Sequence, residues 1–149
     1  MKKKVTWIIV ADGSRARFLA NDGPGKGLHA AIAGEFHHDL PPTRDLGTEK
    51  PGRIASRANT GRSAIQPHVD WHQFEKEKFS QEMANLLNDA AEKKSFDDLI
   101  IVAPPRTLGT LRHALSANTS ERIRAEIPKD LTQVPLREMP GHLKDVIAL

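Results

Sequence analysis

The sequence contains no cysteine, few aromatic residues and no long run of apolar residues. Without cysteine there is no disulfide framework, no thiolate metal site and no cysteine nucleophile. No stretch approaches the roughly 18 apolar residues that a membrane-spanning helix needs. The apolar run at residues 5–11 is too short for a signal peptide, and charged residues follow it where small ones should stand. We therefore expect a cytoplasmic protein with no membrane association and no cofactor.

Aromatic residues make up 5% of the chain, namely two tryptophans and five phenylalanines. None of them is interleaved with the basic residues in the middle of the chain, so bases have no evident platform on which to stack. Any contact with a nucleic acid is then expected to go mainly to its phosphates and its shape.

The composition is that of one globular domain. Hydrophobic residues at 38% and charged residues at 28% describe a soluble protein, and 149 residues can bury a single core. We expect one domain over residues 1–149.

The positive charge is concentrated in the middle of the chain. Residues 50–68 include four basic residues, Lys50, Arg53, Arg57 and Arg62, and the next acidic residue is Asp70. Together these four residues carry more positive charge than the net +3 of the whole chain. A concentrated positive potential attracts polyanions, most often nucleic acid. The alternative is an ordinary solvated surface loop.

The first third of the chain predicts three antiparallel strands. Residues 4–11 are apolar on both alternating faces, as in a central strand covered on both sides. Asp12-Gly13 is typical of a type I′ hairpin turn, in which both central residues have positive φ. "SRARFLA" and "LHAAIAGEF" follow as the second and third strands.

The second half predicts helices that alternate with strands. A long helix is expected over residues 70–94, with Trp71 and Phe74 extending its apolar stripe. The strand at about residues 98–103 ends at two prolines, and Thr107 can cap the next helix. Residues 123–127 favour a strand over a helix. The fold class is therefore α/β (α+β): a mixed sheet of about five strands, antiparallel at its start and covered by helices.

A loop at about residues 37–69 separates the two halves. It shows no sustained periodicity and is rich in Pro, Gly, Arg, Asp and Thr. Structureless segments longer than about 15 residues are uncommon in compact domains and are usually functional or disordered. The length of this loop therefore favours a functional role.

The histidines offer only a weak metal site. His68 and His72 are four residues apart, as metal ligands on one helix face can be. However, His68 precedes the expected helix, Pro67 distorts the backbone there, and no His-Glu-x-x-His pattern is present. Surface or loop-anchoring histidines are the favoured interpretation.

Three stretches together resemble a known family: "VADGSRARFL", "GRSAIQPHVDWHQFEKEKF" and "LIIVAPPRTLGTLRHAL", followed by "IPKDLTQVP". The chain resembles the bacterial host attachment proteins, described as "protein required for attachment to host cells", along essentially its whole length. That description names a phenotype and no biochemical activity.

The layout is also similar to the central domain of the archaeo-eukaryotic class-I peptide release factors. In that domain a long basic loop carries a Gly-Gly-Gln motif, directly before a long helix, into the peptidyl-transferase centre. Here Gly61 can match the second glycine, but Asn59 and Thr60 supply no first one, and Arg62 stands where glutamine is needed. Gln66 comes four residues too late. The resemblance therefore implies the fold and a contact with RNA or the ribosome, without the hydrolysis.

Three functional hypotheses follow. The first is a non-catalytic, release-factor-like module that binds ribosome or tRNA through the loop. The second is an interaction protein linked to attachment that binds an acidic protein or polysaccharide. The third is a hydrolase of peptidyl-tRNA esters, or one that uses a metal at His68 and His72. The candidate binding residues are Lys50, Arg53, Arg57, Gly61, Arg62 and Ser63.

Overall fold

The sheet at the centre of the protein is built around strands that are apolar on both sides. The structure, a computed structural model, describes residues 4–38 and 71–149. Its strands are β1 (Thr6–Ala11), β2 (Arg15–Asn21), β3 (His29–His37), β5 (Asp98–Val102) and β6 (Ile123–Ile127). All six residues of β1 are buried, and so are four of the five in β5. The expected central strand with two covered faces is confirmed.

The sheet is mixed, as the sequence predicts. Its strand order is β3-β2-β1-β5-β6. β1, β2 and β3 pair antiparallel, whereas β1 pairs with β5 and β5 with β6 in parallel. A parallel pair needs a crossover connection. The connection from β5 to β6 is mainly helical, whereas the one from β1 to β5 also contains β2 and β3. Consequently β1, β5 and β6 end at the same edge of the sheet.

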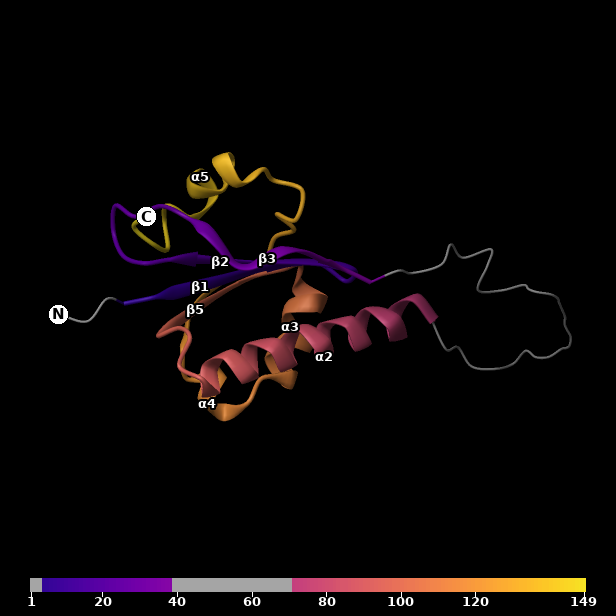
Figure 1. Ribbon diagram of the computed structural model, residues 1–149. Helices are drawn as coiled ribbons and strands as arrows, with labels where there is room; N and C mark the ends of the chain where they lie inside the picture. The colour runs from indigo at the N-terminus through magenta and orange to yellow at the C-terminus, as the bar shows by residue number, and fades with distance from the viewer. Residues whose placement is uncertain (1–3, 39–70) are drawn as a thin grey trace, which may run out of the picture.

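Helices and the C-terminal segment cover the two faces of the sheet. The helices are α2 (Trp71–Glu92), α3 (Pro105–Ala114), α4 (Ala117–Ser120), the 3-10 helix η1 (Leu136–Glu138) and α5 (Met139–Leu143). Figure 1 shows α2, α3 and α4 on one side and α5 on the other. Trp7 and Ile9 of β1 pack toward α2, and Ile8 and Val10 pack in the opposite core with Met139.

Helix α2 confirms the long helix, but its first turn differs from the prediction. Phe79, Met83 and Leu87 form the buried stripe. Trp71 and Phe74 are 55% and 52% exposed, so the expectation that they extend the stripe is wrong. At 3.6 residues per turn these two positions face away from the stripe. The sequence interpretation added these two residues to the stripe because they are apolar, without considering their angular position on the helix.

The hairpin between β1 and β2 is present, but it is not a type I′ turn. Neither Asp12 nor Gly13 is among the described residues with positive φ. Ala11 pairs with Ala16, and the Asp12 N–H donates to the Arg15 carbonyl at 2.9 Å. Asp12 and Arg15 therefore face each other, and the two-residue loop is Gly13-Ser14. The Asp12 carboxylate closes this turn by accepting backbone N–H groups, a local bond typical of aspartate.

The start of α3 also differs from the prediction. The helix begins at Pro105, with Pro104 as N-cap and no side-chain cap, so the expected cap at Thr107 is wrong. Proline suits the first helical position because its φ is already helical and no N–H is lost from the helix ladder. The expected strand at residues 123–127 is confirmed as β6.

The core under α2 gives a direct test of this packing. Leu87 is fully buried, whereas its neighbour Leu86 is only partly buried. We expect Leu87→Ala to lower the free energy of unfolding by about 2–5 kcal/mol, because it removes transfer energy and leaves a cavity. The matched change Leu86→Ala should cost about 1 kcal/mol. Urea unfolding measures both, and equal costs would contradict the assignment of the buried face.

Candidate functional site

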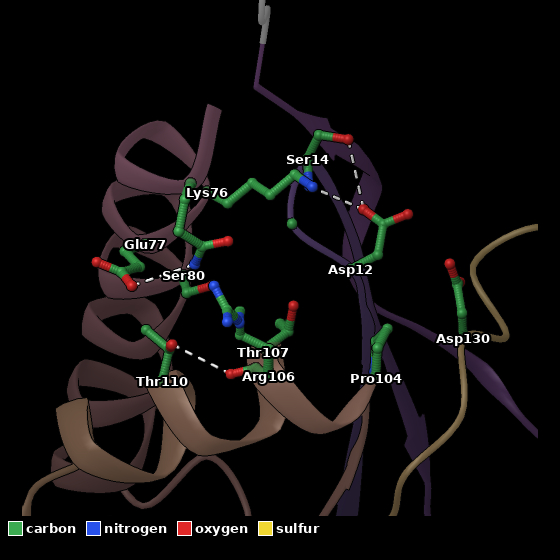
Figure 2. Close-up of a pocket in the computed structure, with 12 residues that line it drawn as sticks. Asp12, Ser14, Lys76, Glu77, Ser80, Pro104, Arg106, Thr107, Thr110 and Asp130 are labelled. Carbon is green, nitrogen blue, oxygen red and sulfur yellow. Dashed lines mark hydrogen bonds between the residues drawn. The ribbon is translucent and has the colours of Figure 1, made fainter. Parts of the chain in front are cut away.

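A pocket of about 310 Å³ opens at the edge of the sheet where β1 and β5 end. It is lined by the turn after β1, the first half of α2, the start of α3 and Asp130, which follows β6. Figure 2 shows Ser80 on α2 facing Arg106 on α3, while Lys76 extends toward Ser14 in the turn after β1. In open α/β sheets ligands usually bind outside the carboxyl ends of the parallel strands. The position of this pocket makes it the first candidate for a binding site.

Asp12 organises one wall of the pocket. Its Oδ1 accepts the backbone N–H groups of Ser14 and Arg15, both at 2.8 Å, and Oδ2 pairs with the Arg15 guanidinium at 3.2 Å. Burial alone would raise the pKa of Asp12. The N–H groups of Ser14 and Arg15 and the charge of Arg15 outweigh it, so the pKa lies below its ordinary value. The carboxylate is therefore ionised at neutral pH.

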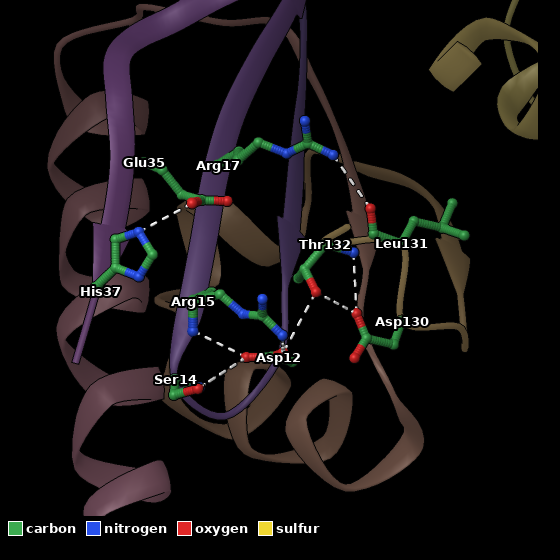
Figure 3. A network of polar contacts seen from close by, with 9 residues as sticks. All are labelled: Asp12, Ser14, Arg15, Arg17, Glu35, His37, Asp130, Leu131 and Thr132. Carbon is green, nitrogen blue, oxygen red and sulfur yellow. Dashed lines mark hydrogen bonds and ion pairs between the residues drawn. The ribbon is translucent and has the colours of Figure 1, made fainter. Parts of the chain in front are cut away.

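The same carboxylate connects this turn to the segment after β6. The Thr132 hydroxyl lies 3.3 Å from Asp12 Oδ2 and also contacts Asp130 Oδ1, which accepts the Thr132 N–H at 2.9 Å (Figure 3). Arg17 on β2 donates to the carbonyls of Leu131 and Val134 in the same segment. Side-chain bonds thus hold Asp130 at the pocket, although it lies far from Asp12 in the sequence.

Gly13 and Lys76 come unusually close together. A Cβ atom at Gly13 would lie 2.6 Å from the Cγ and Cδ atoms of Lys76. Glycine is therefore required here for close approach and not for a positive φ. Figure 2 shows the Lys76 side chain reaching from α2 across this turn toward Ser14.

The pocket is polar and carries charges of both signs. Lys76 and Arg106 are its cations, and Asp12, Glu77 and Asp130 are its carboxylates. Ser14, Ser80, Thr107 and Thr110 add hydroxyl groups. Its described lining includes no histidine, cysteine or aromatic side chain. The arrangement is suited to holding a small charged group, and it offers no serine–histidine pair.

The 39–70 segment joins the described fold beside this pocket. His38 Nε2 lies 2.7 Å from Glu75 Oε1 in the first turns of α2, and the His38 ring packs on Phe79. The His38 N–H donates to the Ser14 carbonyl at 2.8 Å. The residues that flank the segment on its two sides are therefore held together, next to the turn that lines the pocket.

The binding residues predicted from the sequence lie outside this description. Lys50, Arg53, Arg57, Gly61, Arg62 and Ser63 all fall within residues 39–70, as does His68 of the alternative metal pair. The expected loop at about 37–69 lies outside the described residues except at its start, where His37 ends β3. His72 lies in the first turn of α2. Within residues 4–38 and 71–149 no group of three or more His, Cys, Asp or Glu residues is arranged to hold a metal.

Sequence reasoning missed the pocket itself. Asp12 was interpreted only as a turn residue, and neither Lys76 nor Arg106 was singled out. A usable signal was present, because "VADGSRARFL" and "LIIVAPPRTLGTLRHAL" each place polar residues directly after a buried strand. Combined with the rule for parallel strands, these two stretches point to one edge of the sheet.

The fold is that of part of a translation termination factor. An archaeal translation termination factor matches with a TM-score of 0.50 and 13% identity, over 95% of this chain and 38% of its own. A second solved structure, described as an archaeal protein, matches with a TM-score of 0.51 and 15% identity, over 97% and 35%. The chain thus spans little more than a third of either structure. At these identities the likeness is one of fold.

The chain belongs to the family described as "Protein required for attachment to host cells", which it matches over residues 7–143. An uncharacterised protein of Rickettsia prowazekii (strain Madrid E) is 28% identical over 87 residues. That match covers 57% of this chain and 58% of the relative. The family membership and the release-factor-like fold inferred from the sequence are both confirmed. No helix in the described part of the chain is long and apolar enough to cross a membrane.

The network around Asp12 predicts a pH-dependent stability. Asp12→Ala leaves the N–H groups of Ser14 and Arg15 without their acceptor, so we expect it to cost about 1–3 kcal/mol at neutral pH. A lowered folded-state pKa stabilises the fold above the ordinary value of 3.8. This contribution is lost as the pH falls through the folded-state value. Denaturant unfolding should show the difference between wild type and Asp12→Ala narrowing below about pH 4.

Asp89→Ala is the control for this experiment, because Asp89 pairs with Lys93 at an exposed site on α2. Exposed pairs contribute about 0–1 kcal/mol. We expect a small effect at every pH. A difference between Asp12→Ala and wild type that stays constant through the acid range would contradict the role of the Asp12 charge.

Proposed function

We propose that this protein is a non-catalytic RNA-binding module that contacts the ribosome or tRNA through its basic segment. Lys50, Arg53, Arg57 and Arg62 would neutralise phosphates, with Gly61 and Ser63 beside them in the sequence. Phosphate contacts provide most of the affinity of such modules and carry little sequence information.

One observation carries this proposal. The basic segment is inserted between β3 and α2 of a release-factor-like fold, and His38 and Glu75 hold its flanks together at 2.7 Å. Both ends of the segment are therefore attached at one place on the described fold. Its four cations can therefore act on one polyanion rather than being distributed over the surface.

Two exposed aromatic rings add support. Trp71 and Phe74 follow the segment directly, are 55% and 52% exposed, and have ring centroids 6.0 Å apart. The sequence argument against base stacking was that no aromatic residue is interleaved with the basic run. With both rings at the surface, unpaired bases have a platform beside the phosphate-binding segment.

The proposal is one of binding without ester hydrolysis. Arg62 occupies the position where the resemblance requires glutamine, and only Gly61 matches a glycine of the motif. A guanidinium cannot supply the carbonyl oxygen of a glutamine amide, because it carries donors only. Arginine at position 62 therefore lacks the amide of glutamine but carries a positive charge that can bind phosphate.

The salt dependence of binding tests the role of the segment. Replacing Arg53, Arg57 and Arg62 by alanine should reduce the slope of log affinity against log salt by about 2 to 3, since each lost phosphate contact contributes about 0.7–0.9. Fluorescence anisotropy with a single-stranded RNA, and sedimentation with ribosomes, measure the effect.

The matched control is Lys26→Ala, Lys93→Ala and Arg137→Ala in one protein. It removes the same charge from exposed cations elsewhere in the fold. Its slope should stay close to that of the wild type. If the segment variant and the wild type show the same slope, the proposal is wrong.

The stacking platform has its own optical readout. The protein has two tryptophans, and Trp7 is only 9% exposed whereas Trp71 is 55% exposed. We expect single-stranded RNA to quench the fluorescence of Trp71, and Trp71→Phe to abolish the quenching. Trp71→Ala should weaken binding by about tenfold or more. Leu136→Ala, which removes another exposed apolar side chain, is the control. Binding with unchanged fluorescence would exclude stacking on Trp71.

The alternative partner is an acidic protein or polysaccharide, which the same cations could bind. Polyglutamate and heparin added to the anisotropy assay distinguish the two. Tighter binding to either than to RNA at equal salt would favour an interaction protein linked to attachment. Such a protein should also be found outside the cell on fractionation if its role in attachment is direct.

A further inference from the structure

The start of α3 presents unpaired backbone donors to the pocket. The first N–H groups of a helix have no partner within it. Here Pro104 at the N-cap and Pro105 at the first position have no N–H at all, and the Leu108 N–H already donates to the Pro104 carbonyl at 2.8 Å. The N–H groups of Arg106 and Thr107 remain, and both residues line the pocket. The helix dipole adds partial positive charge at this end.

The two cations of the pocket have no ionic partner within residues 4–38 and 71–149. Neither the Lys76 ammonium nor the Arg106 guanidinium takes part in any ion pair or hydrogen bond there. The three carboxylates of the pocket, in contrast, each have a hydrogen-bond or ionic partner. Asp12 is paired with Arg15, Asp130 accepts from Thr132, and Glu77 accepts from the Gln73 amide at 3.1 Å. Glu77 and Asp130 thus have only neutral hydrogen-bond partners, whereas the two cations of the pocket have no partner of either kind in the described part of the chain.

Ser80 provides an independent observation. It is 2% exposed, lines the pocket from α2, and its hydroxyl takes part in none of the hydrogen bonds within the described part of the chain. Figure 2 shows it directed toward Arg106. This hydroxyl is available to donate a hydrogen bond to a ligand oxygen in the pocket.

We propose that this pocket binds a phosphate group. The Arg106 and Thr107 N–H groups, the Arg106 and Lys76 side chains and the Ser80 hydroxyl would surround its oxygens, as at other anion sites on helix N-termini. The proposal goes beyond RNA binding by the basic segment, because none of these residues belongs to that segment. The phosphate can come from an RNA backbone or from a free phosphorylated metabolite.

The lining also limits what else is recognised. With no aromatic ring among its described residues, the pocket has nothing on which a base can stack. The carboxylates of Asp12 and Asp130 are acceptors, and they suit hydroxyl groups next to the phosphate. The ligand is therefore expected to be a phosphate attached to a polar, hydroxyl-bearing group such as a ribose.

Titrations of the full-length protein followed by amide NMR test the proposal. The probes are inorganic phosphate, ribose 5-phosphate, ribose and a short single-stranded RNA. We expect ribose 5-phosphate to shift the amide signals of Arg106 and Thr107, and ribose alone to leave them unchanged. Shifts with phosphate and ribose 5-phosphate but not RNA indicate a free metabolite. Shifts with RNA indicate a backbone phosphate.

Two variants and one control make the test specific. Arg106→Gln should weaken binding of the phosphate probe by about tenfold or more, and Ser80→Ala by about three- to tenfold. Ser80→Ala should leave the melting temperature unchanged or raise it, because the hydroxyl it removes has no partner in the fold. Arg112→Gln, on the same helix but paired with Glu126, should bind like the wild type.

The proposal fails if no phosphate-bearing probe shifts the Arg106 and Thr107 signals. It also fails if Arg106→Gln binds as tightly as Arg112→Gln. RNA binding that is lost in the Arg53, Arg57 and Arg62 variant but kept in Arg106→Gln would retain the role of the segment and overturn the pocket. Loss in Arg106→Gln alone would support the pocket and argue against the segment.

Discussion

The parallel pairing of β1 with β5 is the constraint on which the rest of the structure depends. Both strands are buried on both faces, so the chain must cover the two sides of the sheet with apolar segments. Helices α2 and α3 cover one face, and α5 with the chain that follows covers the other. The parallel direction also places the ends of β1, β5 and β6 at one edge, where the helices diverge and leave the pocket.

The pocket is held in shape by polar contacts between segments that are distant in the sequence. Asp12 fixes the turn after β1 and contacts Thr132, while Gly13 allows the stem of Lys76 to lie across that turn. Lys76 is positioned by α2, and the turns that carry Asp12, Gly13 and Thr132 are fixed by these side-chain bonds. A site supported in this way can hold a charged ligand without first having to order its own residues.

The pocket and the basic segment are chemically different, and the residue that precedes the segment lies beside the pocket. The segment offers several cations along a stretch of sequence, which suits an extended polyanion. The pocket offers two backbone N–H groups, two cations and a hydroxyl around one small volume, which suits a single phosphate. His38 and Ser14 bring the two together, through the His38 N–H bond to the Ser14 carbonyl. A ligand that reaches both would be held by general charge and by one specific contact.

The sequence by itself determined the mixed sheet, the long helix, the buried strands and the family, because periodicity and turn residues act over a few neighbouring positions. It also identified the basic segment. It indicated at most the edge of the sheet where the pocket lies, because Asp12, Ser80 and Arg106 come together only after the crossovers have formed. It misjudged Trp71 and Phe74, because both were counted toward the apolar stripe although helix geometry turns them away from it. The tertiary structure alone decided which cations lack partners, since that depends on distances between residues far apart in the chain.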